Sequence, residues 1–316
     1  MTHPPPPGAP RARIPHPQQP PPSHPRVRTE LWRRFLWSGL ALWTLAAAVT
    51  YGTGNAALLP ALILLGSFLV PVAFVLWAYQ RHGRDLGVNV ILGCFLTGGT
   101  LGVLGASLTV DRLLHPSLRT FAGVSLAEEA MKLGALVFLL RRRTRIRGLR
   151  AGLVLGASVG FGFAAMEGAG YAFQATVATR GVELGALLET EILRGLPASL
   201  GHGLWTAIAG GVLVACRHPD GRFRLTGAVA GACLGVTLLH TLWDSTHGVA
   251  VWLVVRLTGT GPGRPLFAEG YIPHPTEEQQ HLFTVLSLGG LALVALLGVA
   301  WARSLTRRDP SWRSTP

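Results

Sequence analysis

The chain has 316 residues, of which 49% are hydrophobic and 14% are charged. Because a soluble domain usually carries about 25% charged residues, this composition excludes an ordinary water-soluble fold and favours a membrane protein. The formal net charge of +13 would suit a nucleic-acid-binding protein, but the arginines cluster between apolar blocks, as in the cytoplasmic loops of membrane proteins. We therefore expect a membrane-lipid environment and no nucleic-acid partner.

The chain begins with a proline-rich segment. Eleven of the 22 prolines lie within residues 1–25, a composition that cannot form a packed core. We predict a disordered cytoplasmic tail over 1–30, one transmembrane domain over 31–303 and a second cytoplasmic tail over 304–316. The tail lacks the apolar stretch and small-residue cleavage site of a signal peptide.

Apolar blocks of about 20 residues follow, the length at which a helix crosses roughly 30 Å of hydrocarbon. They predict an all-α fold, a polytopic transmembrane helical bundle of about eight spans. The expected spans are 35–51, 57–79, 88–110, 121–140, 151–174, 195–216, 225–250 and 281–302. The first span is the weakest, because its tryptophans would also suit a helix lying in the membrane interface.

The connecting segments differ in charge. Arginines alternate between rich and poor segments along the chain, with 21 on one side of the predicted bilayer and six on the other. Since positive charge marks cytoplasmic loops, we predict a multi-pass protein of the cell membrane with both termini in the cytoplasm. The Gly/Pro-rich loop at 256–280 then faces outward, as a connector or as a cover over an access route.

Ionisable residues interrupt the spans only in the fourth to the seventh. An ionised side chain at membrane depth costs at least about 2.5–3.5 kcal/mol, so each needs a reason. Four of them, Glu129, Glu167, His202 and His240, lie 12 to 17 residues from the nearest cytoplasmic arginine. This is roughly 18–26 Å along a helix, which places the four in one layer in the outer half of the bilayer. Together, the four spans hold Glu128, Glu129, Lys132, Glu167, His202, His240 and Asp244.

Helical spacing groups these residues further. Glu128 and Lys132 are four residues apart and share a face, whereas Glu129 points about 100° away, toward the expected bundle centre. Phe163, Glu167 and Tyr171 form a second stripe with this spacing, and His240 and Asp244 a third pair. Glycines and alanines around Glu167 and His202 permit close helix approach. We expect a catalytic core over about 121–250.

Each residue also has a structural interpretation. Glu128 and Lys132 would form a packing ion pair, Glu167 and His202 would be satisfied core groups, and His240 would bond Asp244. The Gly-x-Ser-x-Gly at 156–160 lies inside a predicted helix rather than a strand-to-helix turn, so we interpret it as a packing stripe. His247 is a candidate partner of His240, and Arg194 is a candidate anchor for a substrate carbonyl or a partner of Glu191.

Carboxylate and imidazole together suit Zn²⁺ or another borderline divalent ion. A bound zinc ion lowers the pKa of its water to about 7, and a carboxylate outside the ligand set then accepts the proton as general base. Peptide hydrolysis is a common reaction of such a site. The chain has no H-E-x-x-H motif, no second intramembrane aspartate and no rhomboid-type Gly-x-Ser-Gly. A proton-relay transporter and a non-catalytic scaffold or immunity-type protein are the alternatives.

Four motifs resemble those of the PrsW family of intramembrane metalloproteases. They are Glu128-Glu129-Ala-Met-Lys132, Phe163-Ala-Ala-Met-Glu167-Gly-Ala-Gly-Tyr171, the histidine His202, and His240-Thr-Leu-Trp-Asp244. The larger group that includes the CAAX prenyl endopeptidases and bacteriocin-immunity proteins has a different pattern, from which Lys132 and Glu167 depart.

The resemblance implies a role for each motif residue. One of the neighbours Glu128 and Glu129 is the base, and the resemblance does not say which. Glu167, His202 and His240 bind a divalent metal, with Asp244 in support. The remaining motif residues, Lys132, Phe163 and Tyr171, assist. The resemblance further implies cleavage of a transmembrane protein, such as the site-1 cleavage of an anti-sigma factor near the outer face.

Overall fold

The computed structural model describes residues 31–109, 117–177, 187–188, 192, 197–259 and 271–309. Its described residues form eight α-helices, one short 3-10 helix and no strand. The tail predicted over 1–30, the chain beyond 309, residues 260–270 of the loop at 256–280 and the residues Arg194 and Glu191 lie outside the described part. The elements are α1 (Leu31–Thr53), η1 (Ala56–Leu58), α2 (Leu59–Leu86), α3 (Val88–Thr109), α4 (Leu118–Leu140), α5 (Leu149–Val177), α7 (Ser199–Ala215), α8 (Gly227–Leu257) and α9 (Glu277–Arg308).

Each of the eight expected spans coincides with one α-helix, so the prediction of an all-α helical bundle is confirmed. Four segments are long and apolar enough on their own to cross a membrane: Leu31–Thr53, Ala56–His82, Leu149–Thr176 and Glu277–Arg308. Two other apolar segments, Val88–Leu104 and Ser199–Ala215, are shorter. The protein is an integral membrane protein built as a helical bundle.

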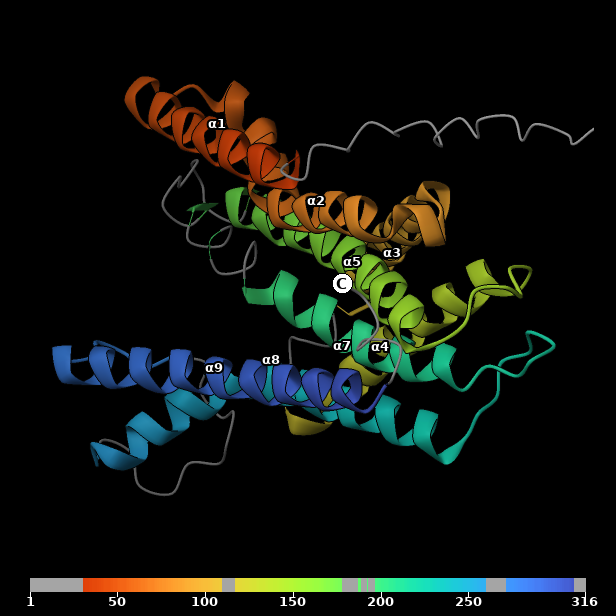
Figure 1. Cartoon of the computed structure of the whole chain (residues 1–316). Coiled ribbons are helices and arrows are strands. Elements are labelled where there is room, and N and C mark those ends of the chain that lie inside the picture. The colour runs from red at the N-terminus through yellow and green to blue at the C-terminus, as the bar shows by residue number, and fades with distance from the viewer. Residues whose placement is uncertain are drawn as a thin grey trace, which may run out of the picture.

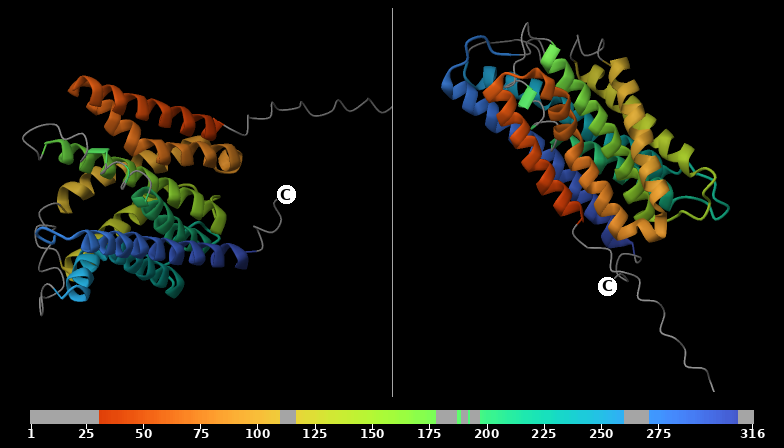
Figure 2. Two further views of the ribbon diagram at one scale, coloured as in Figure 1. Left: turned by 90° about the vertical axis from the view of Figure 1, so that its left-hand side faces the viewer. Right: turned by 90° about the horizontal axis from the view of Figure 1, so that it is seen from above.

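The helices lie in layers with α5 at the centre (Figures 1 and 2). Helix α5 packs against α3 and α2 on one side and α7 on the other, and α8 and α9 pack beyond α7. Helix α1 packs on α2 at the edge of the bundle. Most of α5 is buried, whereas α1 and α9 expose most of their length. Apolar side chains on these outer helices, such as Trp37 and Leu296, suit contact with lipid.

Close contact between α5 and α7 depends on glycines spaced four residues apart on α5. A Cβ atom at Gly152, Gly156 or Gly160 would collide with backbone atoms of α7, namely those of Gly210, Thr206 and His202 respectively. Only a residue without a side chain permits this approach. The packing role predicted for the Gly-x-Ser-x-Gly segment is therefore confirmed, and Ser158 is buried and donates to the Val154 carbonyl within its own helix.

The opposite face of α5 meets α3 in the same way. A Cβ atom at Gly98 or Gly102 of α3 would strike the backbone of α5, and a Cβ atom at Gly162 of α5 would strike the carbonyl of Phe95. Helix α5 is thus held tightly between two neighbours. This fixes the depth at which it presents its single acidic residue, Glu167.

A buried arginine joins two connections at one end of the bundle. Arg217, which follows α7, donates from its guanidinium to the carbonyls of Leu140, Arg143 and Ile146 and also to that of Gly221, at 2.6–3.0 Å. The side chain is buried, so its charge is balanced by carbonyl dipoles rather than by water. The α4–α5 and α7–α8 connections are consequently locked together.

Replacing Gly156 by alanine tests the α5–α7 packing. The added methyl group would meet the backbone of Thr206 and Ala207, and overpacking of this kind costs about 1–3 kcal/mol. We expect a lower thermal unfolding midpoint in detergent, measured by tryptophan fluorescence. Gly170→Ala on the same helix is the matched control, because nothing lies within 4 Å of its added Cβ. Equal midpoints for the two variants would contradict the packing account.

Candidate active site

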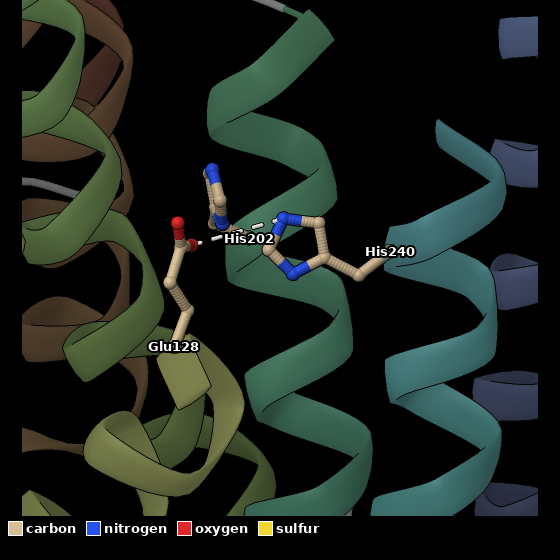
Figure 3. A group of neighbouring side chains, drawn as sticks. All are labelled: Glu128, His202 and His240. Atoms are coloured by element: carbon tan, nitrogen blue, oxygen red, sulfur yellow. Dashed lines mark ion pairs between the residues drawn. The ribbon is translucent and has the colours of Figure 1, made fainter. Parts of the chain in front are cut away.

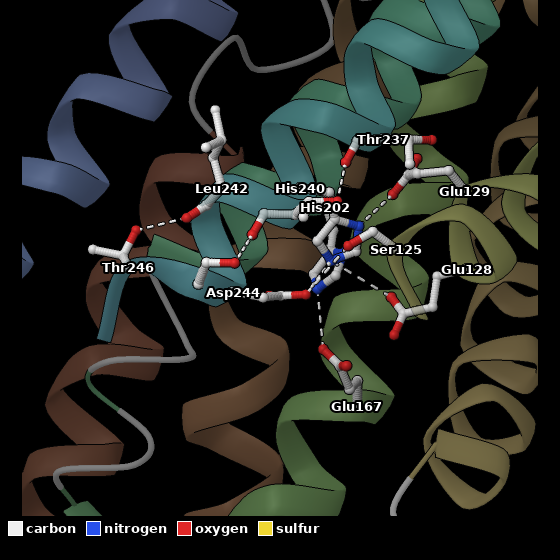
Figure 4. Close-up of polar contacts among 12 residues, drawn as sticks. Ser125, Glu128, Glu129, Glu167, His202, Thr237, His240, Leu242, Asp244 and Thr246 are labelled. Atoms are coloured by element: carbon white, nitrogen blue, oxygen red, sulfur yellow. Dashed lines mark hydrogen bonds and ion pairs between the residues drawn. The ribbon is translucent and has the colours of Figure 1, made fainter. Parts of the chain in front are cut away.

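Four helices bring their ionisable residues into one buried cluster between α4, α5, α7 and α8 (Figure 4). Glu128, Glu129 and Lys132 project from α4, Glu167 from α5, His202 from α7 and His240 from α8. All six side chains are buried. The residues that the sequence placed in one layer therefore meet at the same place in the bundle. A seventh, Asp244, lies at the margin of the cluster, where its side chain is 28% exposed.

Lys132 is the only lysine of the chain, and it lies at the centre of the cluster. Its Nζ is 2.8 Å from Glu129 Oε1, 2.8 Å from His202 Nδ1 and 3.4 Å from Glu128 Oε2. The same ammonium lies 4.1 Å from the centre of the Phe163 ring, a cation–π contact. An ammonium is a compact charge with three donors that point in different directions, unlike the planar fork of an arginine. A lysine ammonium therefore suits a site in which hydrogen-bond acceptors surround the charge.

The two ring nitrogens of His240 face different glutamates of the Glu128–Glu129 pair. Its Nδ1 lies 3.1 Å from Glu129 Oε1, while its Nε2 lies 3.8 Å from Glu128 Oε2 and 3.4 Å from Asp244 Oδ2. Because a carboxylate only accepts, we assign the hydrogen on Nδ1 to the bond with Glu129. The Nε2 lone pair is then directed toward Glu128 and Asp244. Glu129 orients the ring, as carboxylates commonly do for histidines that bind metals.

His202 is held between Lys132 and Glu167. Its Nε2 lies 3.0 Å from Glu167 Oε2, opposite the contact of its Nδ1 with Lys132. The two imidazole rings lie edge to face with centres 4.9 Å apart. Trp205 stacks on His240 with ring centres 4.8 Å apart. Each ring is therefore fixed by a carboxylate on one side and by aromatic packing on another.

Glu128, His202 and His240 form a buried group whose potential ligand atoms all lie within 4.8 Å of one another (Figure 3). The cluster contains four carboxylates, counting Asp244, and one ammonium. Such an excess of negative charge is costly in a bundle core unless a cation balances it. Oxygen and imidazole nitrogen donors are those that zinc and similar divalent ions use. The residues present thus fit a divalent metal.

Three further residues support the cluster, and the sequence analysis missed them. Thr206 donates to Glu129 Oε2 at 3.4 Å, and Ser125 donates to Asp244 Oδ2 at 3.5 Å. Thr206 follows His202 by four residues, and Ser125 precedes Glu129 by four, so the same helical spacing would have placed both on the site face. Trp205 follows His202 by three residues, so this spacing would also have placed it near the site face.

Of the other expected residues, Tyr171 and His247 lie further out, whereas Phe163 lies within the cluster. Tyr171 is half-buried on α5, one turn beyond Glu167. His247 is exposed and its ring packs edge-on against Phe283 of α9. Phe163 is fully buried beneath Lys132 and His202, with its ring centre 5.4 Å from that of His202.

A comparison with family models matches residues 86–261 to the description "PrsW family intramembrane metalloprotease". The match covers more than half of the chain and contains the whole cluster. The chain belongs to the PrsW family. It is accordingly an intramembrane peptidase, a peptide hydrolase that depends on a divalent metal and acts on a membrane protein within the bilayer.

The PrsW match begins at the end of α2, so helix α1, nearly all of α2 and α9 lie outside it. Neither a curated protein nor a solved structure matches the chain.

Substituting Lys132 tests its place in this PrsW cluster. Lys132→Met leaves the carboxylates without their ammonium, and removing one partner of a buried ion pair costs about 3–5 kcal/mol. We expect a marked fall in the thermal unfolding midpoint. We also expect Lys132→Arg to fall nearly as far, because a planar guanidinium cannot reach acceptors in three directions. A midpoint for Lys132→Arg equal to that of the wild type would contradict the described geometry.

Proposed function

We propose that the protein hydrolyses a peptide bond of a single-span membrane protein near the extracytoplasmic face, using zinc as its metal. The supporting observation is the convergence of three buried carboxylates, two imidazoles and Asp244 in a site enclosed by four helices. Such an enclosed site has a low dielectric, which strengthens the electrostatic interactions on which hydrolysis depends.

His202 and His240 would hold the ion, with Glu167 and Asp244 as the carboxylate ligands. The position of Asp244 supports this assignment, because its Oδ2 lies 3.4 Å from the Nε2 atom whose lone pair His240 offers. Glu167 Oε2 lies 3.0 Å from His202 Nε2. Since Nδ1 of His202 accepts from Lys132, this Nε2 carries a hydrogen that the ion would have to replace. When bound, a divalent metal polarises a substrate carbonyl and makes its water more acidic.

Glu128 is the general base in this proposal: its carboxylate belongs to the same buried group as His202 and His240 and so lies next to the ion, outside the ligand set. It faces the same side of His240 as Asp244, and a carboxylate there can accept a proton from water. Glu129 faces the other nitrogen and already accepts from Lys132, His240 and Thr206. We therefore assign Glu129 to positioning His240. The two neighbours thus have different roles.

The membrane orientation and the substrate class belong to the same proposal. Residues 31–303 would form one membrane domain of the cell membrane with a catalytic core at 121–250 and both termini in the cytoplasm. The arginine-rich connections around Arg143 and Arg217 lie together, and Glu167 lies 17 residues along α5 from Arg150, or roughly 26 Å. That depth supports cleavage near the outer surface, as expected of site-1 cleavage of an anti-sigma factor.

An apolar cavity of about 590 Å³ supports lateral access of such a substrate. It lies among α2, α5, α7, α8 and α9, and Trp205 forms part of its lining. The same tryptophan stacks on His240, so the cavity adjoins the cluster. The buried Trp205 Nε1 has no acceptor among the described residues. A substrate helix that unwinds locally offers carbonyl oxygens to such a donor, whereas a lipid chain offers none.

Conservative substitution of the two glutamates tests their separate roles. We expect Glu128→Gln to retain bound metal and to lower kcat by about 10²–10⁴-fold, the usual contribution of a general base. We expect Glu129→Gln to lower metal affinity by about 10–100-fold, because it loosens the orientation of a ligand. Metal content measured by mass spectrometry, with cleavage of a single-span substrate in detergent, distinguishes the two.

Two results would count against this assignment. Loss of metal from Glu128→Gln would make Glu128 a ligand and leave the base to another carboxylate. Cleavage that persists after complete chelation, or in a variant that lacks both glutamates, would exclude the metal-dependent mechanism.

Replacing either of two alanines of α9 by tryptophan tests the access cavity. Ala295 lines the cavity, whereas Ala300 is exposed outside it. We expect Ala295→Trp to fill the space and raise KM for a membrane substrate, with metal content unchanged, and Ala300→Trp to behave like the wild type. Equal cleavage kinetics for the two variants would show that the substrate does not use this route.

A further inference from the structure

A second cavity, of about 370 Å³, lies away from the active site, at the arginine-rich end of the bundle. It is formed where α2 ends and α5 begins, beside the α4–α5 connection. The charged residues of its lining are Arg145, Arg147, Arg150 and Asp85, and the buried His82 also lines it. Three guanidinium groups and one carboxylate thus line a space large enough for a small ligand.

Most of these guanidinium donors have no acceptor within the described part of the protein. Arg147 uses its Nε to donate to the carbonyl of Thr144 at 2.8 Å, and its terminal nitrogens have no described acceptor. No described group accepts from Arg145. Both arginines are exposed at the cavity. They are therefore available to a ligand that supplies several acceptor oxygens.

Arg150 and His82 form the inner wall of the cavity. Arg150 donates through Nε and Nη2 to His82 Nδ1 at 3.2 and 2.9 Å. Since a guanidinium can only donate, Nδ1 is the acceptor, and we assign the hydrogen of the neutral ring to Nε2. The wall therefore carries donors and positive charge, and the carboxylate of Asp85 is the only acidic group among the lining residues.

The loop that carries Arg145 and Arg147 is built in advance of any ligand. The buried guanidinium of Arg217 binds the carbonyls of Arg143 and Ile146, on either side of Arg145. Gly148 then turns the chain into α5 with a φ of 88°, a conformation that favours glycine. A fixed loop keeps the arginines at the cavity and lowers the entropic cost of binding.

We infer that this cavity binds a phosphate group, and that an anionic phospholipid headgroup supplies it. Guanidinium groups bind phosphate through paired donors, and basic pockets between membrane helices at the cytoplasmic surface bind lipid headgroups. The cavity lies at the ends of two membrane helices, where headgroups lie. Free phosphate has the same chemistry and is the second possible source.

Lipid retention by the full-length protein tests this inference. The protein is purified in detergent with equal amounts of phosphatidylglycerol and phosphatidylcholine, and the retained lipids are counted by native mass spectrometry. We expect the wild type to retain phosphatidylglycerol preferentially. In Arg145→Gln/Arg147→Gln the ratio of the two retained lipids should fall about five-fold for each arginine removed, since a basic residue near the surface contributes about 1 kcal/mol.

The matched control is Arg222→Gln/Arg224→Gln. It removes the same charge from exposed side chains of the α7–α8 connection, outside the cavity, and should leave the ratio unchanged.

Adding inorganic phosphate distinguishes the two sources of the phosphate group. Free phosphate is identified as a source if it displaces the retained lipid, or if it binds only to proteins in which Arg145 and Arg147 are intact. Equal effects of the two double variants would overturn the inference. So would a wild type that shows neither lipid preference nor phosphate binding. The lipid ratio within one sample does not depend on how much of a variant folds.

Discussion

The ammonium of Lys132 is the interaction on which the site depends. It lies within 3.4 Å of two carboxylates and within 2.8 Å of His202, in a region where all of these groups are buried. Carboxylates without such a partner would be too costly in the bundle core. A single ammonium does not balance four of them, however, and the remaining negative charge favours a divalent cation. The same electrostatic demand therefore explains both the placement of the sole lysine and the metal dependence of the family.

Glycine packing makes this convergence possible. Backbone contacts at Gly152, Gly156 and Gly160 bring α5 against α7, and Gly160 lies against the backbone of His202. A larger residue there would push the two helices apart and separate Glu167 from His202, which now lie 3.0 Å apart. The small residues thus determine the geometry of the chemistry as well as the stability of the bundle, because in a membrane close packing replaces much of the hydrophobic driving force.

Much of this arrangement could be predicted from the sequence. Eight apolar blocks predicted eight helices, since the length of a span is fixed by the bilayer. The similar depths of Glu129, Glu167, His202 and His240 predicted that these side chains would meet. The sequence could not separate Glu128 from Glu129, because their roles depend on which nitrogen of His240 each one faces. In the sequence, Arg217 is one of the arginines that mark the predicted cytoplasmic connections. Its burial under the α4–α5 connection depends on tertiary contacts that no local pattern encodes.

The central claim is that imidazoles and carboxylates of four helices hold one metal ion. X-ray absorption spectroscopy of the zinc-loaded, full-length protein tests it most directly. The account predicts a shell of nitrogen and oxygen ligands at about 2.0–2.2 Å, with scattering from two imidazole rings, one of which is lost in His240→Ala. A sulfur ligand at about 2.3 Å, which would come from one of the free cysteines Cys94, Cys216 and Cys233, would contradict it. So would a spectrum that His240→Ala leaves unchanged.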